Sequence, residues 1–242
     1  MTDRWTIVDL VLVVLGALGG SMVGYVIAAA LTPDPNVALL SSLVGQFVGS
    51  VGVLALISRM RGLGFDSLGF DLRLTDLLYV GVGVALQIGL SVLLAPLQGL
   101  LMPEGGPSQE LADAFMGLDT PGTKIVMVAV ATFMAPLSEE LMFRGILLRA
   151  LQNRSRRAIV LITSLVFAAF HLVGVTSVPA GVIVFIQIVI VGLVLAHVTL
   201  RHDRLGPAIF IHGGFNLVAA LVLLLPPEIL EQLEQAGAWL RF

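Results

Sequence analysis

The chain has 242 residues, of which 57% are hydrophobic and only 12% are charged, and its mean hydropathy is +1.02. These values lie outside the range of a water-soluble domain and are typical of a protein that resides in a lipid bilayer. A net charge of −3 provides no basic surface for nucleic acid, so no nucleic-acid partner is expected. The absence of cysteine excludes disulfides, thiolate metal sites and a cysteine nucleophile.

Seven apolar runs have the length of membrane-spanning helices. Spanning the hydrocarbon takes about 20 residues in a helix, because the backbone must satisfy its own hydrogen bonds in lipid. No run shows the strict alternation of a barrel strand, so we predict an all-α, polytopic transmembrane bundle that forms a single domain over residues 1–242. We place the spans at roughly 7–31, 37–57, 77–101, 122–150, 158–175, 180–199 and 206–225.

The first two spans carry small residues at every fourth position. Such spacing lets helix backbones approach closely in a membrane, so we predict tight packing between these two helices. The residues are Gly16, Gly20 and Gly24 in the first span and Ser41, Gly45 and Gly49 in the second.

The basic residues predict the orientation of the bundle. Ten of the 13 lysines and arginines precede the first span, fall between spans two and three, four and five, or six and seven, or, as Arg149 does, lie at the end of span four that adjoins such a segment. In an alternating bundle these segments share one side, and the excess of basic residues marks the cytoplasmic side. We therefore expect a multi-pass protein of the inner or plasma membrane with a cytoplasmic N-terminus.

The fourth span contains two adjacent carboxylates, Glu139 and Glu140, whereas the other acidic residues lie in loops, at span borders or in the tail. A charge at the bilayer centre costs roughly 2.5 to 3.5 kcal/mol, which makes it a candidate for function. Glu140 and Arg144 are four residues apart and can pair on one helix face. Glu139 lies about 100° around the helix and is left without such a partner.

Three further polar residues lie at a depth similar to that of Glu139. His171 falls within the fifth span, and His212 and Asn216 lie one turn apart in the seventh. At about 1.5 Å per residue from the nearest arginine-rich border, Glu139 lies about 15 Å deep, His171 about 21 Å, His212 about 12 Å and Asn216 about 18 Å. The sequence therefore predicts that polar groups from three helices meet inside the membrane.

Two kinds of hydrolytic site can be built from these residues. In the first, Glu139 and His171 hold and deprotonate a water, while His212 and Asn216 donate hydrogen bonds to the oxyanion that forms when water adds to a peptide carbonyl. In the second, Glu139, His171 and His212 bind a zinc ion and leave one position open for water. We favour the first, without a cofactor, because the amide of Asn216 suits an oxyanion donor better than a metal ligand.

Two functions from other classes use the same residues differently. A non-catalytic immunity or scaffold protein could bind a peptide at the polar cluster, and a transporter could relay protons through it. A transporter is favoured by an inverted repeat or paired broken helices, and the sequence shows neither. All four polar residues of the proposed water-activating site, namely Glu139, His171, His212 and Asn216, are present, and this favours an enzyme.

Three motifs carry a resemblance to a known family. Glu-Glu-x-x-x-Arg at 139–144, Phe-x-x-x-His at 167–171 and His-x-x-x-Asn at 212–216 follow one another on successive hydrophobic segments. In this order they resemble the motifs of the CAAX prenyl protease and bacteriocin-processing (CPBP, or Abi) family of intramembrane endopeptidases. The resemblance covers about residues 120–220, which we expect to form the protease core.

The resemblance also implies roles and a substrate class. Glu139 and His171 would activate water, and His212 and Asn216 would stabilise the oxyanion. Glu140, Arg144 and Phe167 would support the site. Both a glutamate and a zinc mechanism have been proposed for this family. The substrate would be a membrane-associated or lipidated peptide or protein, and the short loops resemble those of bacterial members.

Overall fold

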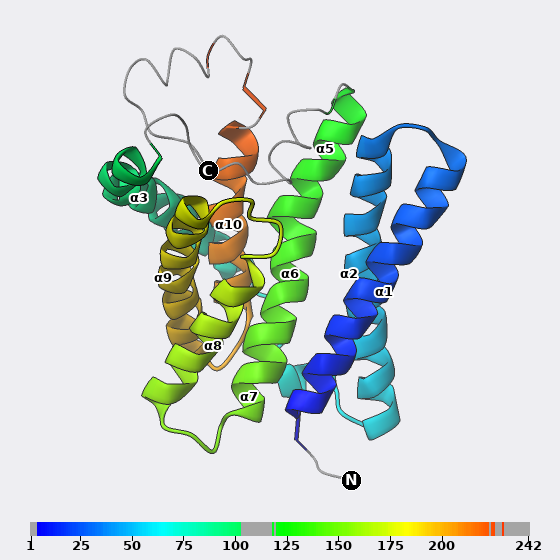
Figure 1. Cartoon of the computed structure of the whole chain (residues 1–242). Helices are drawn as coiled ribbons and strands as arrows, with labels where there is room; N and C mark the ends of the chain where they lie inside the picture. The colour runs from blue at the N-terminus through cyan, green and yellow to red at the C-terminus, as the bar shows by residue number, and fades with distance from the viewer. Residues whose placement is uncertain (1–3, 103–117, 119, 223, 226–228, 230–242) are drawn as a thin grey trace.

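The computed structural model describes residues 4–102, 118, 120–222, 224–225 and 229, and this part of the chain folds into helices and loops without a β-strand (Figure 1). The predicted all-α class is confirmed. The α-helices are α1 (Ile7–Leu31), α2 (Pro35–Arg61), α3 (Leu78–Leu101), α5 (Pro121–Ala129), α6 (Ala135–Glu140), α7 (Leu148–Ala150), α8 (Arg156–Phe170), α9 (Val178–His202) and α10 (Gly206–Val222). Two short 3₁₀ turns, η1 (Phe65–Leu68) and η2 (Leu74–Leu77), precede α3.

Five of these segments are long and apolar enough to cross a membrane, and α10 is a shorter apolar helix. The predicted spans coincide with helices to within a few residues, with one notable difference. The fifth span was predicted over 158–175, but α8 ends at Phe170 and His171 is its C-terminal capping residue. The chain then turns through Gly174, whose φ of 82° is readily adopted only by glycine. His171 therefore lies at the end of a helix and not within one.

The α1–α2 hairpin packs backbone against backbone. A Cβ atom at Gly20 would overlap the carbonyl oxygen of Gly45, and a Cβ at Gly45 would overlap that of Gly20. Gly24 meets the carbonyl of Ser41 and Gly49 meets that of Gly16 in the same way. The predicted small-residue contact is confirmed, because any larger side chain would push the two helices apart.

Polar contacts join the arginine-bearing segments at one end of the bundle. Arg4 donates a hydrogen bond of 3.4 Å to the side chain of Asn153, which lies between α7 and α8. Arg204, between α9 and α10, forms two hydrogen bonds of 2.6 and 2.7 Å with Asp76. These bonds raise the pKa of Arg204. The arginines therefore share one end as predicted, and the cytoplasmic location of that end stays a prediction.

The helix that carries the two glutamates runs through the middle of the bundle, between the α1–α2 hairpin and the group formed by α8, α9 and α10 (Figure 1). It is continuous from Pro121 to Ala150, but two stretches of it are π-helical: η3 (Val130–Met134) and η4 (Leu141–Leu147). All seven residues of η4 are buried. The glutamates thus lie at the end of α6, directly before η4, and π-helical stretches of this kind often accompany functional sites.

Candidate active site

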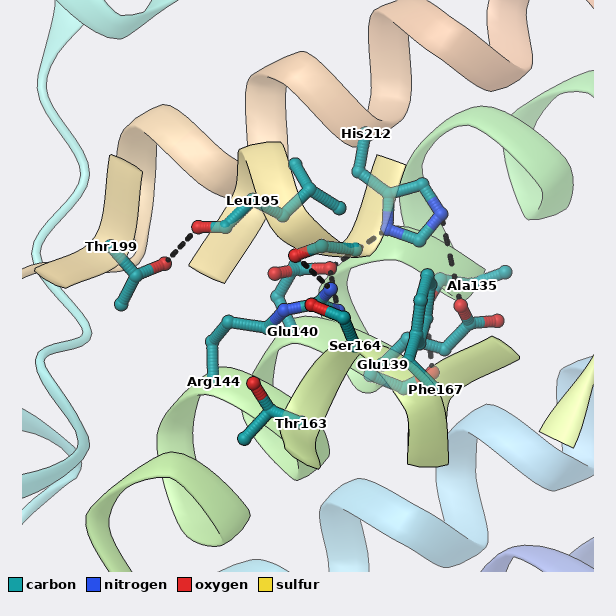
Figure 2. Close-up of polar contacts among 12 residues, drawn as sticks. Ala135, Glu139, Glu140, Arg144, Thr163, Ser164, Phe167, Leu195, Thr199 and His212 are labelled. Atoms are coloured by element: carbon teal, nitrogen blue, oxygen red, sulfur yellow. Dashed lines mark hydrogen bonds and ion pairs between the residues drawn. The ribbon is translucent and has the colours of Figure 1, made fainter. Parts of the chain in front are cut away.

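Glu139, His171 and His212 converge on one point from three different helical segments. The Oε2 atom of Glu139 lies 3.6 Å from Nε2 of His171 and 3.7 Å from Nε2 of His212. Glu139 and His212 face one another in Figure 2. The side chains of Glu139 and His171 retain 19% and 28% of their exposure, whereas His212 retains 3%. Within the described part of the chain, the group is therefore accessible from the side of Glu139 and His171.

The Oε2 atom of Glu139 is buried, and within the described residues it accepts no hydrogen bond. Buried carboxylate oxygens in folded proteins nearly always have a hydrogen-bond donor, so an oxygen without one needs an explanation, such as a bound water or a catalytic role. From the sequence, Glu139 was predicted to have no ion-pair partner on its own helix. The structure points that carboxylate at two imidazole rings.

The orientation of His171 is fixed by the chain that precedes it. Its Nδ1 atom lies 2.9 Å from the carbonyl oxygen of Phe167, and because a carbonyl can only accept, Nδ1 carries the hydrogen. The neutral ring therefore presents the lone pair of Nε2 to Glu139. Phe167 also packs its ring against the imidazole, with 4.5 Å between the ring centroids.

His212 is held by Glu140. Its Nδ1 atom lies 2.9 Å from Oε1 of Glu140, and the same oxygen accepts a hydrogen bond of 2.9 Å from Arg144 (Figure 2). The side chains of Glu140 and Arg144 are fully buried. The spacing correctly predicted the Glu140–Arg144 pair. It could not reveal that Glu140 also orients His212, because those two residues are 72 positions apart.

Arg144 connects the glutamate-bearing helix to α8 and α9. Its guanidinium carbon lies 4.2 Å from the ring centroid of Phe167, which is a cation–π contact. It also donates a hydrogen bond of 3.3 Å to the carbonyl oxygen of Gly192. A Cβ atom at Gly192 would lie 3.0 Å from the backbone of Ser164, so glycine lets α8 and α9 approach at this level. No motif in the sequence predicted this role of Gly192.

Asn216 contacts the glutamate-bearing helix at its first π-helical stretch. Its amide nitrogen donates a hydrogen bond of 2.9 Å to the carbonyl oxygen of Ala131. In an α-helix that oxygen would accept from Ala135, but the N–H of Ala135 bonds to Val130. In a π-helix it would accept from residue 136, which is proline and has no N–H. The amide of Asn216 therefore replaces a missing main-chain donor and uses one of its two N–H groups to do so.

The zinc alternative concerns the same three side chains, Glu139, His171 and His212. Structural and catalytic zinc ions are bound through oxygen or nitrogen atoms at about 2.0–2.2 Å. Among the residues that the structure describes, no group of three or more His, Cys, Asp or Glu side chains is arranged to hold a metal ion. The preference for a metal-free site therefore stays a prediction.

Comparison with known proteins supports the resemblance carried by the motifs. Residues 121–218 match the model of the family described as type II CAAX prenyl endopeptidase Rce1-like. The comparisons with curated proteins and with solved structures gave no match. The matched segment begins with α5 and ends within α10, so it contains each residue of the converging group. The chain is thus a multi-pass membrane protein whose residues 121–218 match the Rce1-like CAAX endopeptidase family, the family that its three motifs indicated.

Proposed function

We propose that this protein is an intramembrane endopeptidase that hydrolyses a peptide bond of a membrane-associated or lipidated substrate without a metal ion. One observation carries the proposal. The buried Oε2 atom of Glu139 lacks a hydrogen-bond donor among the described residues and faces the Nε2 atoms of two histidines at 3.6 and 3.7 Å. The family match over residues 121–218 supports a peptide hydrolase.

A water molecule fits the chemistry of the converging atoms. The carboxylate oxygen of Glu139 and the Nε2 atom of neutral His171 both carry lone pairs, and at 3.6 Å they are too far apart for a direct hydrogen bond. A water that donates one hydrogen to each atom satisfies both. The same two bonds hold the water oxygen ready to attack a carbonyl carbon.

Glu139 acts as the general base in the first step. It takes a proton from water as the water oxygen bonds to the peptide carbonyl carbon, and the electrons of the C=O π bond move onto the carbonyl oxygen. The tetrahedral intermediate then collapses. The C–N bond breaks, and Glu139 gives the proton to the departing amine, which leaves a new carboxyl and a new amino terminus.

His212 and Asn216 stabilise the oxyanion. The carboxylate of Glu140 orients the ring of His212 through Nδ1, so a proton carried on Nε2 would be directed toward the reacting carbonyl. The bond from Asn216 to Ala131 fixes the amide and leaves its second N–H for the same oxygen. Donors that are already oriented do not need to reorganise as the negative charge develops.

The proposal is tested by comparing newly formed peptide termini in membranes of cells that lack this protein. The cells are restored with wild type or with Glu139→Gln at equal protein levels. Termini that appear only with wild type would establish the protease and name its substrate. Identical profiles would overturn the enzyme hypothesis and favour a peptide-binding or immunity function. We further propose that the protein resides in the cell membrane with its arginine-bearing end in the cytoplasm.

A further inference from the structure

A groove lies between α8 and α9, away from the converging carboxylate and histidines. Its volume is about 450 Å³, and it opens to the surface of the bundle. Three apolar residues and three basic or titratable residues line it: Val160, Leu161 and Leu193, and Arg156, Arg157 and His197. Arg156 precedes His171 by a full helix length, about 22 Å at 1.5 Å per residue, so the groove is separate from the candidate active site.

The two arginines of this groove have no partner inside the described part of the protein. Neither Arg156 nor Arg157 forms a hydrogen bond or ion pair there, although several other arginines do. Those that pair with carboxylates are Arg61, Arg73, Arg144, Arg149 and Arg204. Two adjacent cations are therefore free to bind an anion from outside the chain.

The backbone adds to the positive potential at this position. Arg156 is the first residue of α8, and Ser155 caps the helix by accepting a hydrogen bond from the N–H of Ala158. The N–H groups of the first turn that precede Ala158 have no partner within the helix. Together with the helix dipole they favour a phosphate between the two arginine side chains.

The remainder of the groove is suited to a hydrocarbon chain. Val160, Leu161 and Leu193 follow the basic residues into the apolar part of the bundle, and Leu161 is 51% exposed. A soluble anion would leave these side chains uncovered, whereas a lipid would cover them while its phosphate reached the arginines. The basic end of the groove thus suits the phosphate of a lipid, and its apolar side suits the acyl chain of the same lipid.

We propose that this groove is a binding site for an anionic phospholipid. The phosphate lies between Arg156 and Arg157, and one acyl chain runs along Val160, Leu161 and Leu193. The groove is at the arginine-bearing end of the bundle, which is the end predicted to face the cytoplasm, where anionic lipids attract basic residues near the surface. Neither the lipid nor its site depends on the proposed protease activity.

The test counts lipids bound to the purified full-length protein. The protein in detergent is titrated with phosphatidylglycerol or with phosphatidylcholine that has the same acyl chains, and bound lipid is measured by native mass spectrometry. We expect tighter binding of phosphatidylglycerol. Removing one arginine near an anionic headgroup weakens binding about fivefold, so Arg156→Gln combined with Arg157→Gln should weaken it about twenty-five-fold.

A matched control separates this groove from general surface charge. Arg154 and Arg201 are exposed arginines of the same end that do not line the groove, and Arg154→Gln combined with Arg201→Gln should leave phosphatidylglycerol binding within twofold of wild type. Thermal unfolding of both double variants in phosphatidylcholine micelles checks that the fold is retained. Equal losses in the two double variants would overturn the proposal, as would equal binding of the two lipids. Competition by soluble glycerol phosphate at the same concentration would instead identify a simple anion site.

Discussion

Asn216 donates a hydrogen bond to the carbonyl oxygen of Ala131 at 2.9 Å, in the place where the main chain has no donor to offer. The π-helical stretch η3 and Pro136 together leave that carbonyl without its usual partner. The bond joins α10, which carries His212, to the helix that carries Glu139. A proline five residues from Ala131 thereby determines how a side chain from another helix is oriented.

Replacing this proline should reduce catalysis without weakening substrate binding. In Pro136→Ala the new N–H can donate to Ala131 and displace the amide of Asn216, which would then lose its fixed orientation. We expect kcat on the identified substrate to fall about tenfold, the scale of a misplaced hydrogen-bond donor, with KM within twofold. Pro96→Ala, a substitution inside α3, is the matched control and should leave both constants unchanged. Equal effects of the two substitutions would refute the role of Pro136.

The neighbouring glutamates should respond differently to the same substitution. Glu139→Gln retains the shape of the side chain but removes the base, so kcat should fall by about 10² to 10⁴. Because Glu139 Oε2 makes no hydrogen bond within the described residues, the midpoint of thermal unfolding in detergent should hardly change. Turnover near the wild-type rate would eliminate Glu139 as the base.

Glu140→Gln should instead destabilise the protein. The substitution leaves Arg144 fully buried beside a neutral amide, and loss of one partner from a buried ion pair costs about 3 to 5 kcal/mol. It also weakens the bond that orients His212. Thermal unfolding at a clearly lower temperature than for Glu139→Gln is the expected result, and equal midpoints for the two variants would contradict it.

Activity should not require a metal ion. The purified enzyme is dialysed against a chelator, and its zinc content and turnover are then measured on the same sample. We expect turnover to stay within twofold of the untreated sample after zinc has been removed. A zinc equivalent that is lost together with activity, and that restores activity when added back, would establish the zinc mechanism instead.

The α1–α2 contact offers two adjacent glycines for comparison. Gly20 faces the carbonyl of Gly45, whereas a Cβ atom at Gly19 would meet no atom within 4 Å. Gly20→Ala should therefore destabilise the protein by about 1 to 3 kcal/mol through overpacking, while Gly19→Ala should be neutral or slightly stabilising because alanine is the better helix former. Thermal unfolding in detergent measures both. Equal effects would show that the close approach does not contribute to stability.

The sequence was most informative where one physical rule dominates. Hydropathy located the helices, because a backbone that crosses lipid must form all of its hydrogen bonds internally, as a helix does. Helical spacing identified the Glu140–Arg144 pair, and counting residues from the arginine-rich border brought Glu139 and the two histidines to a common depth. Each of these inferences depends on regular geometry along one helix.

What the sequence could not supply depends on contacts between helices. The bond from Glu140 to His212 requires knowledge of how α10 is rotated against the glutamate-bearing helix. The end of α8 at Phe170 could not be predicted, because the turn that follows it through Gly174 lies in an apolar stretch that resembles the rest of the helix. The partner of Asn216 followed only from the π-helical register before Pro136, since in a regular α-helix the carbonyl of Ala131 would already be bonded.

The glycine contact between α1 and α2 also bears on how the protein is assembled. The two helices follow one another in the chain and are separated by a short loop, so their interface forms between neighbours in sequence with little loss of chain entropy. This pair can associate as soon as both helices have entered the bilayer. The converging group of Glu139, His171 and His212 is complete only after α10 has been inserted. During synthesis the closely packed α1–α2 hairpin can therefore form before the helices that contribute Glu139, His171 and His212 have assembled.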